Sequence, residues 1–319
     1  MVRVANANFP EPTPEFNQKC IAIVNRFASG ELQYEQALAE LEALAHEANE
    51  SGHLVNQGRV EQLMGYVQHY RGNLDISIRH NERARNLFAR AGNPRRVAII
   101  DLNQGENYRF KGELNRAAKL YQSAYEFAEQ FGDIQLQTQA SSNEGLTLLA
   151  LKRYDEAHVA FNKSLKLAQQ LDIQDANVAT LLCEIYHGLA EIHLHEGNLE
   201  SAWIRAVEAI QLAEQANQPL IKGYANRTLG EVLTDLKTAP DSRFSSEPDD
   251  YFRESLRYFQ DLKAEAEMAR TLFAQSLSLA KRGRRTMAAK KLQQVMDMFT
   301  KLGMVDDAAR AAEAQLLLM

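Results

Sequence analysis

Four polar residues between positions 184 and 195 have the types and the spacing that could bind a divalent metal ion. Glu184, His187, Glu191 and His195 follow one another at intervals of three or four residues, so a helix would place them along one stripe. Imidazole and carboxylate groups are zinc ligands, but each ligand atom must lie within about 2 Å of the ion. His187 and His195 would be two helical turns apart, which is too far for one compact site. We therefore expect this stripe to form the polar wall of a binding groove.

The rest of the sequence has no recognisable catalytic motif. It contains no GxxxxGK(S/T) phosphate-binding loop, no GxGxxG, no HExxH, no GxSxG and no calcium-binding loop. Cys20 and Cys183 lie far apart, without a CxxC or a Cys/His pair near either, and we expect two reduced thiols that are buried or idle. The sequence thus predicts a protein that is not an enzyme and that needs no cofactor. The alternative is an active site assembled from distant segments.

The charge balance bears on which partners the chain can have. The formal net charge is -6, whereas surfaces that bind nucleic acid are clearly basic. Two basic runs, 78–96 and 281–291, leave a nucleic-acid or membrane-surface patch as an alternative, although we expect these charges to pair with nearby carboxylates. No signal peptide and no run of about 18 apolar residues is present. We expect a soluble, cytoplasmic protein that binds neither nucleic acid nor a membrane.

The elements that would position these side chains are helix pairs that recur along the chain. Residues 98–133 form the clearest copy, in which two helical segments meet at a turn ending in Gly112. A turn residue of the same kind returns roughly every forty residues, a period typical of helical repeat arrays. These turn residues are Gly30, Gly72, Gly112, Lys152, Gly197, Lys237 and Gly283. Glycine suits the position because a helix often ends on a residue with positive φ.

One helix pair is too small to be stable alone, because its apolar face cannot offset the entropy of ordering about forty residues. The pairs must stack, and the sequence predicts an all-α, right-handed superhelical solenoid of about seven antiparallel pairs. Within it we expect a flexible, proline-containing lead-in over residues 1–14, the repeat array over 15–303, an insertion loop at about 238–249 and a capping helix over 304–319.

The residues of the repeat resemble the tetratricopeptide repeat family. The clearest copy has the family's order of small and aromatic residues, with Gly105, Tyr108, Ala117, Tyr121 and Ala124. The next copy has Gly145, Leu148, Ala157, Phe161 and Ser164. The period near forty is similar to the long-helix variety found in maltose-activator-type regulators, quorum-peptide receptors and polarity adaptors. Asp101 and Gln104 depart from the family pattern, so we expect their helix to be tilted or partly exposed.

The resemblance implies a concave groove lined by the first helix of each pair. Carried over position by position, the candidate groove residues are Arg59, Gln62, Tyr66, His69, Tyr70, Glu106, Arg109, Phe110, Glu184, His187, Glu191, Arg227, Glu231 and Arg270. A mixture of arginine, aromatic and carboxylate side chains suits a peptide or protein segment. The aromatic members support this, because they have little structural reason to face water. The resemblance implies a non-catalytic adaptor or scaffold, and the alternative is a regulatory sensor that a peptide or small ligand compacts.

Overall fold

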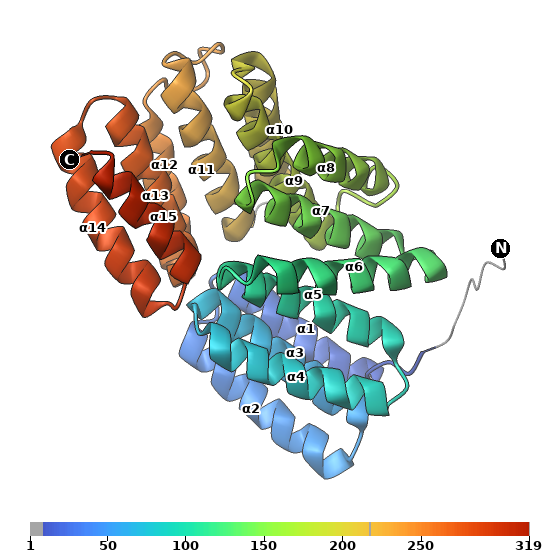
Figure 1. Cartoon of the computed structure of the whole chain (residues 1–319). Helices are drawn as coiled ribbons and strands as arrows, with labels where there is room; N and C mark the ends of the chain where they lie inside the picture. The colour runs from blue at the N-terminus through green and yellow to red at the C-terminus, as the bar shows by residue number, and fades with distance from the viewer. Residues whose placement is uncertain (1–8, 217, 319) are drawn as a thin grey trace.

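The computed structural model describes residues 9–216 and 218–318, and within these ranges it contains fifteen α-helices and no β-strand (Figure 1). The first eight are α1 (Pro14–Ala28), α2 (Tyr34–Ser51), α3 (Leu54–Arg71), α4 (Leu74–Arg90), α5 (Pro94–Phe110), α6 (Leu114–Phe131), α7 (Ile134–Ala150) and α8 (Tyr154–Ala168). The others are α9 (Ala176–His195), α10 (Leu199–Ala216), α11 (Pro219–Leu236), α12 (Pro248–Asp261), α13 (Glu265–Lys281), α14 (Arg285–Lys301) and α15 (Val305–Leu316). The predicted all-α solenoid of seven pairs and a C-terminal helix is confirmed.

The predicted turn residues end the first helix of every pair. All seven have a positive φ, including the two that are not glycine, Lys152 at 58° and Lys237 at 66°. At Lys152 the backbone N–H donates to the Leu149 carbonyl, and the N–H of Arg153 donates to Leu148. These bonds satisfy carbonyl groups that the end of a helix leaves without partners. The recurrence of the turn residue along the sequence therefore reports a recurrent helix stop.

Small and aromatic residues fit together inside each pair, as the family pattern implies. In the α5–α6 pair, a Cβ atom added at Gly105 would lie 2.4 Å from Cε1 of Tyr121. The absence of a side chain on α5 thus makes room for the Tyr121 ring, which is fully buried. Burying an aromatic side chain of this size stabilises the pair by about 1.5–3 kcal/mol.

The expectation that the α5 helix is partly exposed at Asp101 and Gln104 is wrong. Both side chains are buried, and Nε of Arg85 on α4 donates to Oδ1 of Asp101 at 2.7 Å. A buried carboxylate is tolerated when a cation and hydrogen bonds compensate for its desolvation. Here the partner comes from the preceding pair, so Asp101 connects the α3–α4 pair to the α5–α6 pair.

The array curves until its two ends meet, so that the C-terminal helices return to the N-terminal ones (Figure 1). From α3 to α13 each odd-numbered helix contacts the next odd-numbered helix, and α13 contacts α3. The closing contact, which we call the seam, is formed by Arg71, Gly72 and Phe110 on one side and Glu265, Arg270 and Leu302 on the other. Six odd-numbered helices therefore form a closed inner ring, and their partners in each pair lie outside it.

Close packing at the seam depends on a glycine. Gly72 has a φ of +88°, and a Cβ atom placed there would lie 2.4 Å from Cδ2 of Leu302. Leu74 and Phe110 share one apolar cluster with Leu292 and Phe299 of α14. The seam is thus a continuous core between residues that are about 200 positions apart in the sequence.

The described part of the lead-in, residues 9–13, is extended but is held against the array. Glu11 forms an ion pair with Arg96, the Pro10 carbonyl accepts a hydrogen bond from Asn93, and the ring of Phe9 packs edge-on against Phe131 at 5.6 Å. Pro14, which we expected in the lead-in, is the first residue of α1. Residues 1–8 lie outside the described residues, so the flexibility expected for the lead-in stays a prediction.

The loop expected at about 238–249 ends earlier, because Pro248 and Asp249 already belong to α12. Charges of the basic run at 281–291 pair with nearby carboxylates, as expected: Arg282 Nη2 lies 2.9 Å from Oδ2 of Asp249 on α12, and Lys281 pairs with Asp235 on α11. Cys20 and Cys183 are buried free thiols, in agreement with the sequence. Among the described residues, no helix is long and apolar enough to cross a membrane.

Candidate binding face of the inner ring

The inner ring brings side chains of α5, α9, α11 and α13 together across its centre. The carboxyl group of Glu184 on α9 lies within the electrostatic influence of Glu106 and Arg109 on α5, of Arg227 on α11 and of Glu267 on α13. We call the polar side chains of these helices that meet at the centre the inner face. Many of the predicted groove residues therefore do converge, although they come from helices far apart in the sequence.

One part of the inner face is a network of ion pairs. Nη1 of Arg227 donates to Oε2 of Glu267 at 2.7 Å, and only 9% and 5% of the two side chains are exposed. Arg270 lies 3.2 Å from Asp307 of the capping helix α15, and its guanidinium lies 3.6 Å from the centre of the Phe110 ring. The positive charges of Arg227 and Arg270 are thus already compensated inside the protein.

A second ion pair lies on α5, where Arg109 donates two hydrogen bonds to Glu106. The hydroxyl of Tyr121 donates a third to Oε2 of the same carboxylate at 2.9 Å. Burial alone would raise the pKa of Glu106, but the charge and hydrogen bonds of Arg109 lower it to about 2. Glu106 is therefore ionised and fully paired. Through Tyr121 it is also connected to the core of the α5–α6 pair.

The aromatic candidates pack against one another. The rings of Tyr66 and Tyr70 lie 4.7 Å apart and both meet the ring of Phe27 on α1 edge-on. His69 shares a hydrogen bond of 2.8 Å with Asn107, and its ring lies against the ring of Phe110, which is only 4% exposed. These rings therefore have a structural role, because they build the seam and the first pairs, and their presence does not by itself indicate a binding groove.

A third part of the inner face, the acidic group, consists of Glu184, His187, Glu191 and Glu231. Burial, followed by the positive charge of Arg227, lowers the pKa of His187 to about 3, so its imidazole is neutral at pH 7. The imidazole lies 3.7 Å from Glu231 and 4.0 Å from Glu191, and it shares a hydrogen bond with Thr228. These contacts provide polar neighbours for the carboxylates but no compensating charge.

The carboxylates of the acidic group have no cationic partner among the residues that the structure describes: no lysine or arginine there forms an ion pair with Glu184, Glu191 or Glu231. Burial raises the pKa of Glu184 to about 8 and that of Glu231 to about 7, and it also raises the pKa of Glu191. Water still reaches the group, since 46% of the Glu191 side chain and 31% of the Glu231 side chain are exposed. The group is therefore accessible, and within the described residues none of its carboxylates forms an ion pair with a lysine or arginine.

Not all of the sequence-predicted residues meet at this face. His195 turns aside and stacks on Tyr154, with 3.6 Å between ring centres, and within the described ranges no three His, Cys, Asp or Glu side chains are grouped as a metal ion would require. Arg59 donates to Gln62, which is buried, and burial lowers the pKa of Arg59 to about 10. Arg59 and Gln62 both lie on α3, the first helix of the ring.

Two residues of the ion-pair network were missed by the sequence reasoning. Glu267 precedes Arg270 by one helical turn, so the spacing on the expected helix could have indicated it. Asp307 lies in the capping helix, outside the repeat pattern, and no repeat-based signal points to it. The face thus includes a contribution from the C-terminal helix that a repeat template does not contain.

Comparisons with known proteins find solved structures that have a similar architecture. No protein-family model matches the sequence, and no curated protein matches it by sequence. Among solved structures, the chain is similar to a Rap protein complexed with competence and sporulation factor (12% identity, 96% of this chain and 98% of that chain, TM-score 0.58). It is also similar to aspartyl phosphate phosphatase F from Bacillus subtilis (14% identity, 89% and 70%, TM-score 0.65). A third similar structure is a signal transduction ATPase with a tetratricopeptide repeat sensor from Pyrococcus horikoshii (14% identity, 94% and 44%, TM-score 0.52). At these identities the likeness shows the fold, which is a helical repeat solenoid of the tetratricopeptide type.

Proposed function

We propose that this protein is a non-catalytic binding protein that takes a peptide or protein segment on its inner face. The observation that carries the proposal is the acidic group, whose three carboxylates are accessible to water and lack a cationic partner within the described residues. A lysine or arginine side chain of a bound segment would supply that charge. The complex of a similar fold with competence and sporulation factor is consistent with this mode of binding.

The energetic argument follows from the difference between the two halves of the inner face. The arginines are already paired with Glu106, Glu267 and Asp307, so a ligand gains little by offering them a carboxylate. The acidic group keeps its carboxylates partly protonated because the cost of burying them outweighs the attraction of the arginine and lysine charges in their surroundings. A bound cation relieves this cost, and the protein should therefore select a basic segment.

A peptide array probed with labelled protein tests the proposal. The variant Glu191→Lys plus Glu231→Lys reverses the charge of the two most accessible carboxylates. The matched control, Glu42→Lys plus Glu200→Lys, makes the same change at exposed positions on α2 and α10. We expect the wild type and the control to bind the same peptides, enriched in lysine and arginine, and the inner-face variant to lose them. Equal patterns for all three proteins would remove the inner face as the binding site.

The absence of catalysis is part of the proposal and has its own test. One similar structure is named a phosphatase, so hydrolysis of acetyl phosphate is a suitable assay. We expect no turnover above the rate in buffer. Hydrolysis that disappears in Glu184→Gln would replace the binding function with an enzymatic one.

A second candidate function is a regulatory sensor, and the seam favours it. Because the ring is closed by contacts between its two ends, a ligand on the inner face can shift the balance between a closed and an opened ring. Small-angle scattering distinguishes the two functions. A sensor changes its radius of gyration when a peptide from the array is added, whereas a rigid adaptor keeps it.

A further inference from the structure

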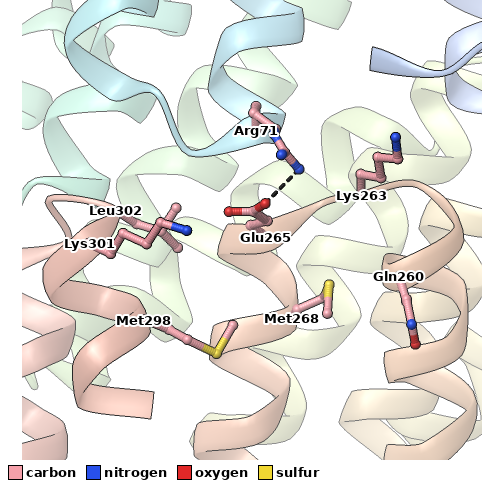
Figure 2. Close-up of a pocket in the computed structure, with 8 residues that line it drawn as sticks. All are labelled: Arg71, Gln260, Lys263, Glu265, Met268, Met298, Lys301 and Leu302. Carbon is pink, nitrogen blue, oxygen red and sulfur yellow. Dashed lines mark ion pairs between the residues drawn. The ribbon is translucent and has the colours of Figure 1, made fainter. Parts of the chain in front are cut away.

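A cleft of about 320 Å³ lies at the seam, at the ends of the helices and apart from the inner face. Figure 2 shows its lining, in which Arg71 at the end of α3 faces residues of the C-terminal helices. The lining residues that matter here are Arg71, Lys263, Glu265, Met268, Met298 and Lys301. The volume is at the lower end of the range for sites that bind small molecules.

The charges around the cleft are unbalanced. Three cationic side chains and one carboxylate line it, and that carboxylate, on Glu265, is already bound to Arg71 at 2.6 Å. Lys263 reaches only the exposed carboxylate of Glu35, at 3.3 Å. Lys301 forms no ion pair with any residue in the described part of the chain. The rim of the cleft therefore has an excess of positive charge that an anion would compensate.

The rest of the lining is apolar. Met268 and Met298 point into the cleft from α13 and α14, and Leu302 lies beside Lys301 (Figure 2). Methionine side chains are unbranched and adaptable, and they suit surfaces that pack against flexible apolar ligands. The cleft thus combines a cationic rim with an adaptable apolar lining, which is an arrangement for an amphipathic anion.

We propose that the seam cleft binds a small organic anion with an unbranched apolar tail, of the class of medium-chain carboxylates. The carboxylate pairs with Lys301, which has no ion pair within the described residues, and the tail lies along Met268, Met298 and Leu302. Since Arg71 belongs to α3 and the other lining residues to the segment 260–302, the complete cleft exists only while the two ends of the array are together. This proposal is independent of the function assigned to the inner face.

Calorimetric titration of the full chain with sodium octanoate tests the proposal. Octylammonium, with the same tail and the opposite charge, and acetate, with the charge and almost no tail, are the comparison ligands. We expect saturable binding of octanoate, an affinity for acetate at least tenfold lower, and no binding of octylammonium. Failure of octanoate to bind, or equal binding of octylammonium, overturns the proposal.

Two variants locate the binding. Lys301→Glu should reduce the octanoate affinity at least tenfold, whereas Lys290→Glu, an exposed charge reversal on the same helix, should leave it unchanged. Met298→Gln keeps the cationic rim and should weaken octanoate but not acetate. If Lys301→Glu and Lys290→Glu both bind octanoate as the wild type does, the ligand binds elsewhere and the proposal is wrong. Circular dichroism establishes that each variant is folded before its affinity is compared.

Discussion

The buried ion pair between Arg227 and Glu267 provides the sharpest test of the inner face. Glu267→Gln removes the negative charge while keeping the shape of the side chain. Nη1 of Arg227 and Oε2 of Glu267 are 2.7 Å apart, and less than a tenth of either side chain is exposed. The variant therefore leaves the desolvated guanidinium of Arg227 without its main partner. Breaking a buried pair in this way typically costs about 3–5 kcal/mol. We expect a loss of that size in the free energy of unfolding.

The same reasoning predicts that removing both charges does less harm. In Arg227→Met plus Glu267→Leu the remaining cation, Arg270, keeps Asp307 as a partner at 3.2 Å. Replacement of a buried pair by apolar residues of similar size is often neutral or stabilising. The double variant should therefore recover most of the stability that Glu267→Gln loses.

Urea unfolding followed by circular dichroism gives the free energies, with hydrogen exchange to locate the loss. A repeat array need not unfold in one step, so exchange in α11 and α13 should be compared with exchange in α2 as an internal reference. The pKa of Glu267 is below its usual value in spite of burial, because Arg227 and Arg270 stabilise the carboxylate. Its contribution is thus present at neutral pH and is lost in acid. A loss below about 1 kcal/mol for Glu267→Gln, or a double variant as unstable as the single one, would refute the account of a desolvated pair.

Three further predictions concern other parts of the molecule. The affinity for a basic peptide should rise as the pH is raised through about 7 and about 8, which are the pKa values of Glu231 and Glu184. The reason is that each carboxyl group must lose its proton before it can pair with a cation. Anisotropy titrations across this pH range check the rise, and Glu184→Gln should flatten its upper part. Gly72→Ala should lower stability by at least about 1 kcal/mol more than Gly52→Ala. Both glycines have positive φ, but only the new Cβ atom at position 72 would meet Leu302. Thermal unfolding compares the two variants, and equal losses would show that the close contact at the seam does not matter. Glu11→Arg should place like charges at positions 11 and 96 and so release residues 9–13, which limited proteolysis near the N-terminus detects. Peptide binding at the inner face should not change.

The repeated features of the fold could be predicted from the sequence because each one depends on local chemistry. A helix stop needs a residue that accepts positive φ, and all seven predicted turn residues have it. The pairing of Gly105 with Tyr121 is likewise a contact between positions at a fixed spacing within one pair. Such signals recur with every copy, so their repetition identifies them even where single copies are irregular.

The closure of the ring could not be predicted, because it results from small rotations that accumulate over all the pairs. A repeat template treats Phe110 as a groove residue, whereas in the closed ring it is covered by Arg270 from the other end of the chain. The same reason explains Asp101: the template offers no partner, while the folded array supplies Arg85. The charge state of Glu184 also depends on four helices at once, so no single segment contains the information.

The seam has a consequence for how this protein can change in evolution. An open solenoid can gain or lose a helix pair by duplication or deletion, because each pair contacts its neighbours alone. Here α3 must meet α13, and Gly72 must meet Leu302, after a fixed number of intervening pairs. One pair more or less would move Arg71 away from Glu265 and leave the apolar cluster around Phe110 and Phe299 uncovered. The number of pairs between α3 and α13 is therefore constrained by geometry, as the number of blades is in a closed propeller.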